Sequence, residues 1–229
     1  MRRTVLGLAA LTLTLGLGAT PAHADTPYDP AESDFAACPA KPAGAQDWTC
    51  YVLTTLDGQV RLRNMNAHVN TQYRLTVAQG KLAGGATVAK MGAVQGAPIP
   101  FVTGIINTPL EIPHFTGWKL QIAATPYIEP GLTMPSKFGL KARIVGDGLG
   151  DNCWIGSDAA PVVVQPRPQW ALPWFFGNTL MVKSKVYDDV FAILPATGCA
   201  SLTPNILIGA ANATSNHLDI TWAIRHKTF

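Results

Sequence analysis

Four cysteines follow a segment with the pattern of an export signal: Cys38, Cys50, Cys153 and Cys199. An even cysteine count in an exported chain is typical of a disulfide framework, because the thiols meet an oxidising compartment. Of the three possible connectivities we favour Cys38–Cys50, closing 11 intervening residues, and Cys153–Cys199, closing 45. Zinc binding is the alternative. Neither pair has zinc-knuckle spacing and no histidine lies at a matching offset, so we predict no metal site.

The first 24 residues have the three parts of a signal peptide. Arg2 and Arg3 form a charged start, residues 5–18 are apolar, and Ala22-His23-Ala24 is a small-x-small cleavage site. No later run reaches the length of a membrane-spanning helix without a charge or a proline. The sequence therefore predicts a secreted protein, with a mature chain that starts at Asp25 and has no membrane span.

The composition of the mature chain limits its partners. Its 205 residues suit a single domain. The formal charge falls from +3 to +1 when Arg2 and Arg3 are removed, and no Lys/Arg cluster remains, so we predict no nucleic acid partner. Charged residues are only 14% of the chain. Such a weakly charged surface suits a protein that meets lipid or a cell-wall component, whereas the oligomeric state stays open.

Period-two alternation of apolar residues predicts a mainly β protein: an antiparallel β-sandwich or barrel-like fold with two disulfides. Residues 25–48 are predicted as an extended arm and residues 49–229 as the β domain. Within it, Asp57-Gly58 suits a two-residue turn, which predicts a hairpin with Leu53 opposite Leu62. Further strands are expected around residues 73–77, 118–122, 138–144, 161–164, 178–187 and 217–226. The expected helical pieces are short, at 188–194 and 204–210.

Three stretches around the cysteines carry a resemblance. They are residues 150–157 (GDNCWIGS) with Pro161-Val162, Cys38-Pro39 with Trp48-Thr49-Cys50, and residues 189–192 (DVFA) with Pro195 and Gly198-Cys199. Together they resemble small secreted proteins common in actinobacteria, most of them without an assigned activity. Some similar exported Streptomyces proteins carry the label cholesterol esterase. The resemblance covers most of the mature chain and implies a lipid ester as a substrate, but it assigns no catalytic residues.

A search for esterase chemistry finds only fragments. A serine hydrolase usually presents its nucleophile on Gly-x-Ser-x-Gly, which is absent, and the nearest fragment is Gly156-Ser157-Asp158. Such a tripeptide is far more often a turn. His217 and Asp219 are two residues apart on a predicted strand, which leaves them poorly placed to bond each other. The esterase alternative therefore names Ser157, His217 and Asp219. The Gly- and Asp-rich stretch 146–152 lacks calcium-loop spacing and is predicted to be a turn.

The most unusual composition lies at residues 170–176 (WALPWFF), where Trp170, Trp174, Phe175 and Phe176 are candidate ligand-binding residues. Aromatic rings stack on sugars and sit well at lipid interfaces, although packing over an open end of the sandwich is the more usual outcome. A second apolar region, 99–115, is a candidate for the other wall of a cleft. Two hypotheses follow: an exported structural or binding module for an apolar or polymeric ligand, or a small lipid esterase. Neither requires a cofactor.

Overall fold

The computed structural model describes residues 31–63, 65–69, 73–104, 111–112, 117–176, 179–208 and 216–229. The predicted signal peptide and the first residues of the predicted arm lie outside this set, as does most of the apolar region 99–115. The elements are η1 Glu32–Ala37, β1 Ala45–Leu62, β2 Met65–His68, β3 Arg74–Leu82, β4 Thr87–Gln95, β5 Ile99–Gly104, β6 Glu111–Ile112, β7 Lys119–Glu129, β8 Lys137–Val145, β9 Trp154–Ile155, β10 Val162–Val164, β11 Arg167–Phe176, β12 Thr179–Asp188, α1 Thr203–Ile208 and β13 Asn216–Thr228.

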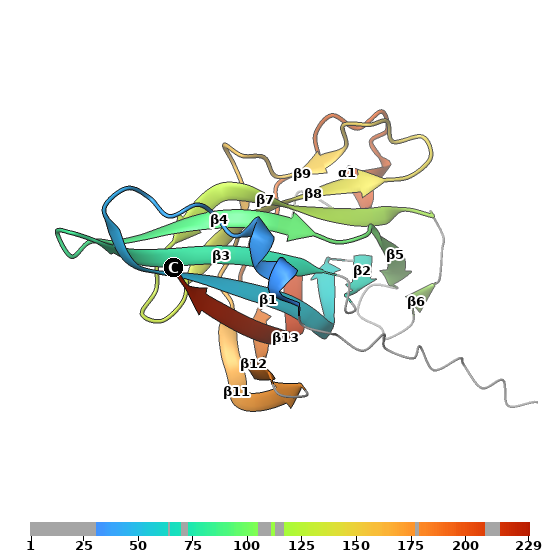
Figure 1. Cartoon of the computed structure of the whole chain (residues 1–229). Helices are drawn as coiled ribbons and strands as arrows, with labels where there is room; N and C mark the ends of the chain where they lie inside the picture. The colour runs from blue at the N-terminus through green and yellow to red at the C-terminus, as the bar shows by residue number, and fades with distance from the viewer. Residues whose placement is uncertain are drawn as a thin grey trace, which may run out of the picture.

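The fold is an antiparallel β-sandwich, as the alternating sequence predicted (Figure 1). The first sheet has the order β11–β12–β13–β1, and β1 then pairs with β3 through its N-terminal part and with β2 near its C-terminal end. The second sheet contains β7, β8, β9 and β10. Strand β5 belongs to both, because it pairs with β2 and with β7.

The main core lies between the two sheets. From the first sheet it receives Leu53, Ile220 and Trp222, and from the second Leu120 and Ile144. Ile220 and Trp222 are two residues apart in β13, so both point to the same side of the sheet. Parts of β1 and β3 are buried on both faces, because the N-terminal segment covers their outer side. Burial of these large apolar side chains is the main driving force for packing the sheets.

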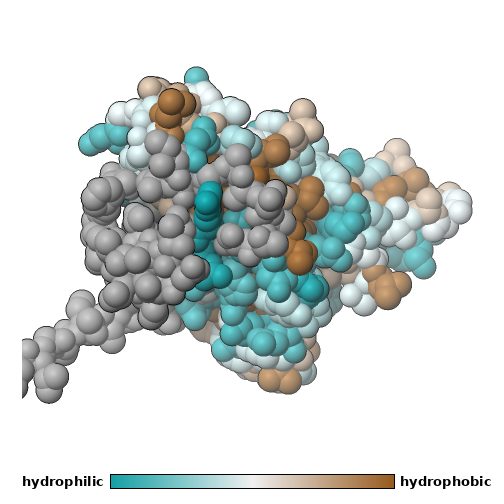
Figure 2. Space-filling model, turned by 180° about the vertical axis from the view of Figure 1, so that it is seen from behind, coloured by the Kyte–Doolittle hydropathy of each residue, from teal (hydrophilic) through white to brown (hydrophobic). Residues whose placement is uncertain are grey.

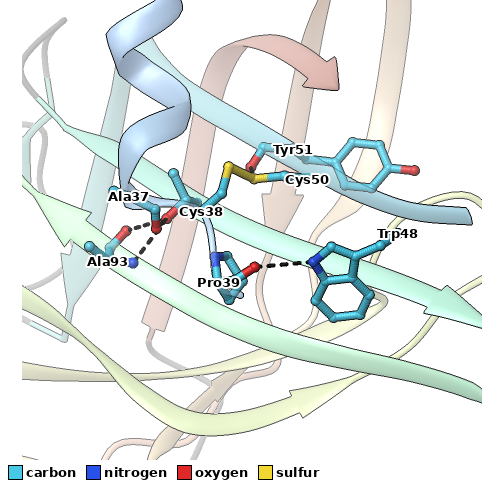
Figure 3. Close-up of a disulfide and its surroundings, with 8 residues drawn as sticks. Ala37, Cys38, Pro39, Trp48, Cys50, Tyr51 and Ala93 are labelled. Atoms are coloured by element: carbon cyan, nitrogen blue, oxygen red, sulfur yellow. Dashed lines mark hydrogen bonds between the residues drawn. A yellow bond between two sulfur atoms is a disulfide. The ribbon is translucent and has the colours of Figure 1, made fainter. Parts of the chain in front are cut away.

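Both disulfides form with the predicted pairing, Cys38–Cys50 and Cys153–Cys199. Figure 3 shows how the first fixes the N-terminal segment to the outer face of the first sheet. Beside the bridge, Trp48 Nε1 donates to the carbonyl of Pro39 at 3.1 Å, and Thr76 Oγ1 donates to that of Ala37 at 2.9 Å (Figure 3). The predicted arm therefore contains a short helix, η1, and β1 begins at Ala45, before the predicted boundary at Thr49.

The predicted hairpin at Asp57-Gly58 is wrong, because β1 runs straight through this dipeptide. Its register against β13 shifts between Thr55 and Asp57, so Leu56 is the extra residue of a β-bulge, and no turn forms here. The reversal comes at Arg63, whose φ is 55°, and Leu62 therefore pairs with Met65. Asp57 and Gly58 are compatible with a turn and also with the paired strand that follows the bulge. Only the long partner strand β13 selects between them.

The predicted helix at 188–194 is also wrong. Phe191 and Ile193 are buried while Ala192 and Leu194 are exposed, which is the two-residue period of an extended chain. Asp188 is fully buried and accepts hydrogen bonds from the backbone N–H of Gln165 at 2.7 Å and of Val190 at 3.0 Å. Its carboxylate therefore joins two irregular segments instead of capping a helix. The second predicted helical piece is present in part, as α1.

Replacing Asp188 with alanine should lower the free energy of unfolding by about 2 kcal/mol, because two buried N–H groups lose a charged acceptor. Asp189→Ala is the matched control. Its carboxylate is exposed and pairs with Arg167 at the surface, where such pairs contribute about 0–1 kcal/mol. Urea unfolding of both variants measures the difference. Equal losses would show that the buried hydrogen bonds of Asp188 carry no special weight.

Candidate functional site

The aromatic segment singled out in the sequence forms strand β11, not a loop. Residues 167–176 pair with β12 to make a two-stranded hairpin at the edge of the first sheet, here called the ribbon (β11 and β12). Figure 1 shows the ribbon extending away from the packed sheets. Trp170, Trp174 and Phe176 are half-buried, whereas Phe175 is 65% exposed. The segment is therefore neither fully buried core nor fully exposed.

The pairing register of the ribbon assigns its side chains to two faces. Ala171 lies opposite Ser184, Pro173 opposite Val182, and Phe175 opposite Leu180, so these pairs share one face. This is the same face as Trp222 and Ile224 of β13, which line the main core, because Ser184 pairs with Trp222 and Val182 with Ile224. The core-facing side of the first sheet therefore continues onto the ribbon.

The opposite face of the ribbon has its own small cluster. Met181 and Ala223 are buried there, with Leu56, Trp174 and Phe176 packed against them. The Trp174 and Phe176 rings meet edge to face, with centroids 6.2 Å apart. These contacts attach the half of the ribbon nearest its turn to β1 and β13, so the hairpin is braced on this side while its core-facing side stays open.

An apolar cleft of about 440 Å³ opens where the core-facing side of the ribbon leaves the sandwich. One wall is the first sheet and the ribbon, and the other is the connection between β7 and β8. The lining residues are Tyr51, Thr133, Met134, Pro135, Ser136, Pro166, Pro168, Ala171, Val182, Ser184, Val186, Trp222, Ile224 and His226. Most of these side chains are apolar, and the cleft volume is in the range of small-molecule sites.

Two polar ring side chains, Tyr51 and His226, lie beside each other in the cleft. Tyr51 donates a short hydrogen bond from its hydroxyl to the carbonyl of Thr133, which holds the β7–β8 connection over the cleft. The ring of His226 lies beside that of Tyr51, with centroids 6.1 Å apart. Partial burial raises the pKa of the Tyr51 phenol, so the hydroxyl stays protonated and remains a donor across the ordinary pH range.

The three residues of the esterase alternative do not come together as a hydrogen-bonded set. Ser157 lies between β9 and β10, and its hydroxyl accepts a hydrogen bond from Ala160 N–H at 3.0 Å while its own N–H donates to the Ala160 carbonyl. This is the turn that the sequence favoured. No hydrogen bond in the described part of the chain joins Ser157 to a histidine.

His217 and Asp219 do lie together, on the outer face of the first sheet. They border a polar hollow of about 260 Å³ that is also lined by Asp57, Gly58, Gln59, His68 and Lys185. Asp219 pairs with Lys185 at 3.3 Å instead of orienting an imidazole. No serine is among the described residues that line this hollow, so the two candidate partners have no serine nucleophile beside them.

A search of the described residues finds no cluster of three or more His, Cys, Asp or Glu side chains that could hold a metal ion. The Gly- and Asp-rich stretch 146–152 forms the predicted turn, with positive φ at Gly148 and Gly150. Asp151 of this turn pairs with Arg143 at 3.2 Å. Among the described helices, none is long and apolar enough to cross a membrane.

Sequence reasoning drew attention to strand β11, but Trp170, Trp174, Phe175 and Phe176 do not line the cleft, and the other wall was missed. Thr133 to Ser136 carry a single large apolar side chain, Met134, and nothing in their pattern marks them as lining residues. The second wall was expected at 99–115, and the side chains of 101–115 are outside the described set. Comparison of the chain with protein-family models, curated proteins and solved structures gives no match.

Proposed function

We propose that the chain is an exported binding protein whose ligand is an apolar small molecule held in the cleft beside the ribbon. The cleft carries this proposal, because it combines an apolar lining with a few polar groups. Val182, Val186 and Ile224 offer apolar surface, whereas Tyr51 and His226 offer hydrogen-bonding groups. This division is typical of sites that orient an amphipathic ligand.

Two further features support export and a lipid-like ligand. Two disulfides suit an oxidising compartment outside the cytoplasm, in agreement with the leader-like sequence at the N-terminus. The resemblance to small secreted actinobacterial proteins, some labelled cholesterol esterase, points to the same class of ligand. Catalysis is not part of the proposal, because Ser157 bonds within its own turn and the polar hollow of His217 and Asp219 has no serine.

The proposal predicts that a charge placed in the cleft abolishes ligand binding. Val182→Asp puts a carboxylate on the apolar wall, and we expect the affinity for N-phenyl-1-naphthylamine, a fluorescent apolar probe, to fall by at least about tenfold. Val190→Asp is the matched control, because Val190 is an exposed valine in the connection after β12 and does not line the cleft. Fluorescence titration measures the affinities, with thermal melting as the check on folding.

A second pair of variants fills the cleft without adding charge. Ala171 is exposed and lines the cleft, so Ala171→Trp places an indole in the space for the ligand. Ala83→Trp, in the turn between β3 and β4, adds the same ring elsewhere on the surface. Probe binding that is absent from the wild-type protein, or unchanged in both cleft variants, would reject the cleft as the binding site.

A further inference from the structure

The ribbon carries an apolar, uncharged surface, here called the ribbon tip (Leu172, Phe175 and Leu180). From Pro168 to Val182, fifteen consecutive residues include no Asp, Glu, Lys or Arg. Within this stretch Leu172 is 59% exposed and Leu180 61%, which adds to the exposed Phe175. Large apolar side chains that gather on one projecting element mark an interaction surface, whereas single exposed ones are ordinary.

Exposed apolar groups occur on both faces of this tip. Phe175 and Leu180 lie opposite each other on the core-facing side, whereas Leu172 is on the other side with Trp174. The ribbon forms the lower end of the molecule in Figure 1. Hydrophobic residues are visible at the lower end of the space-filling view in Figure 2. Exposed apolar side chains on both faces of one projecting strand pair suit immersion in an apolar medium better than docking against one flat protein surface.

A cation marks the boundary of the tip. Lys183 follows directly after the uncharged stretch, has no carboxylate partner among the described residues, and places its ammonium 5.7 Å from the centre of the Trp174 ring. The other two cations of the ribbon are already paired, Arg167 with Asp189 and Lys185 with Asp219. Trp and Lys together at the edge of an apolar segment are typical of a lipid–water interface, where the ammonium reaches anionic headgroups.

A second copy of the chain fits this surface less well. β11 is the open edge of the first sheet and contains Pro168 and Pro173, which have no N–H to donate and so impede edge-to-edge strand pairing. A symmetric contact through the tip would also bring two copies of Lys183 to one interface. The tip has no carboxylate to pair with either of them.

We propose that the ribbon tip binds the surface of a lipid bilayer that contains anionic lipids. Phe175, Leu180 and Leu172 enter the interfacial region, and Lys183 contacts the phosphates of the headgroups. Insertion is shallow, because the remaining backbone N–H and C=O groups at the open edge of β11 need hydrogen-bonding partners that the hydrocarbon core lacks. This surface is separate from the ligand site, since none of these four side chains lines the cleft.

Co-sedimentation with vesicles tests the proposal. We expect the processed protein to bind phosphatidylcholine vesicles containing phosphatidylglycerol, and Phe175→Ser/Leu180→Ser to bind them at least about tenfold more weakly. Leu132→Ser/Leu202→Ser is the matched control, because both leucines are exposed outside the ribbon, and it should bind as the wild type does. Lys183→Gln should weaken binding to the anionic vesicles only and reduce its dependence on salt.

Three results would overturn the proposal. The first is a wild-type protein that does not sediment with anionic vesicles, and the second is a tip variant that binds as tightly as the control. The third is a concentration-dependent dimer, seen by sedimentation velocity and lost in Phe175→Ser/Leu180→Ser, which would assign the tip to a second copy. Ala171→Trp fills the cleft without adding a charge to the uncharged stretch, so it should keep vesicle binding, and failure of the cleft proposal and failure of the tip proposal are distinguishable.

Discussion

Replacing Cys153 and Cys199 with alanine should lower the free energy of unfolding by about 4 kcal/mol. The bridge links positions 46 apart in sequence, so its loss frees a long loop in the unfolded chain. In the folded protein it ties the irregular segment after β12 to the start of β9. Beside it, Trp154 and Thr197 exchange two backbone hydrogen bonds of 2.9 and 2.8 Å.

Urea unfolding compares this variant with Cys38→Ala/Cys50→Ala, in which the bridged positions are only 12 apart. The same loop-entropy relation gives about 3 kcal/mol for the shorter loop, so the longer bridge should cost about 1 kcal/mol more. A larger loss from the shorter bridge would mean that contacts in the folded N-terminal segment outweigh loop entropy. Both variants should keep the far-ultraviolet spectrum of a β protein, because most of the main core consists of strand side chains other than the bridged cysteines, of which only Cys153 is a buried member.

Gly58→Ala should cost about 3 kcal/mol, an unusually large effect for adding one methyl group. A Cβ atom at position 58 would lie 2.5 Å from the backbone oxygen of Asp219 and 2.8 Å from Cα of Ile220. Both are main-chain atoms of the neighbouring strand β13, so relief requires the two strands to separate. Strand β1 would then lose its pairing register with β13 next to the bulge at Leu56.

Gly84→Ala is the control for this substitution, because nothing lies within 4 Å of a Cβ at that position. Its free energy of unfolding should change by only about 0.5 kcal/mol. Urea unfolding measures both variants, and amide hydrogen exchange at Asp219 and Ile220 reports on the strand pairing itself. A stable Gly58→Ala variant with unchanged exchange would show that the strands yield easily at the bulge.

The cleft and two of the three residues of the ribbon tip lie along the same side of the ribbon. The core-facing side of the ribbon is continuous from the cleft residue Val182 to the tip residues Phe175 and Leu180. A protein that touches a bilayer through the tip therefore presents the mouth of its apolar cleft near the lipid. An apolar ligand that moves between bilayer and cleft would follow this strip of side chains and avoid exposure to water.

The sequence correctly predicted most of the strands whose apolar residues alternate along the chain. Alternation of apolar residues placed β3, β7, β8, β10, β12 and β13, because side chains two apart on a strand share one face. The cysteine number allowed three connectivities, and the one favoured from the sequence is the one observed. The aromatic stretch drew attention to β11, since such composition is unusual for a surface strand.

The errors lie where a distant segment decides the conformation. Asp57-Gly58 suits a turn, but pairing with β13, more than 150 residues later, keeps both residues in strand β1, next to a bulge at Leu56. Asp188 resembles a helix-capping residue, but the N–H groups of Gln165 and Val190 hold it at the end of a strand. In both cases the local preference was nearly balanced, so a single long-range contact was enough to decide it.

The sequence by itself determined the strand-forming segments, the two bridges and the presence of an uncharged aromatic stretch. The tertiary structure decided that this stretch is one strand of a projecting ribbon, which of its side chains remain exposed, and that the β7–β8 connection closes a cleft beside it. The physical reason is that exposure and cavity shape depend on where opposing sheets end. That depends on long-range packing, which the alternation of residues along one strand does not contain.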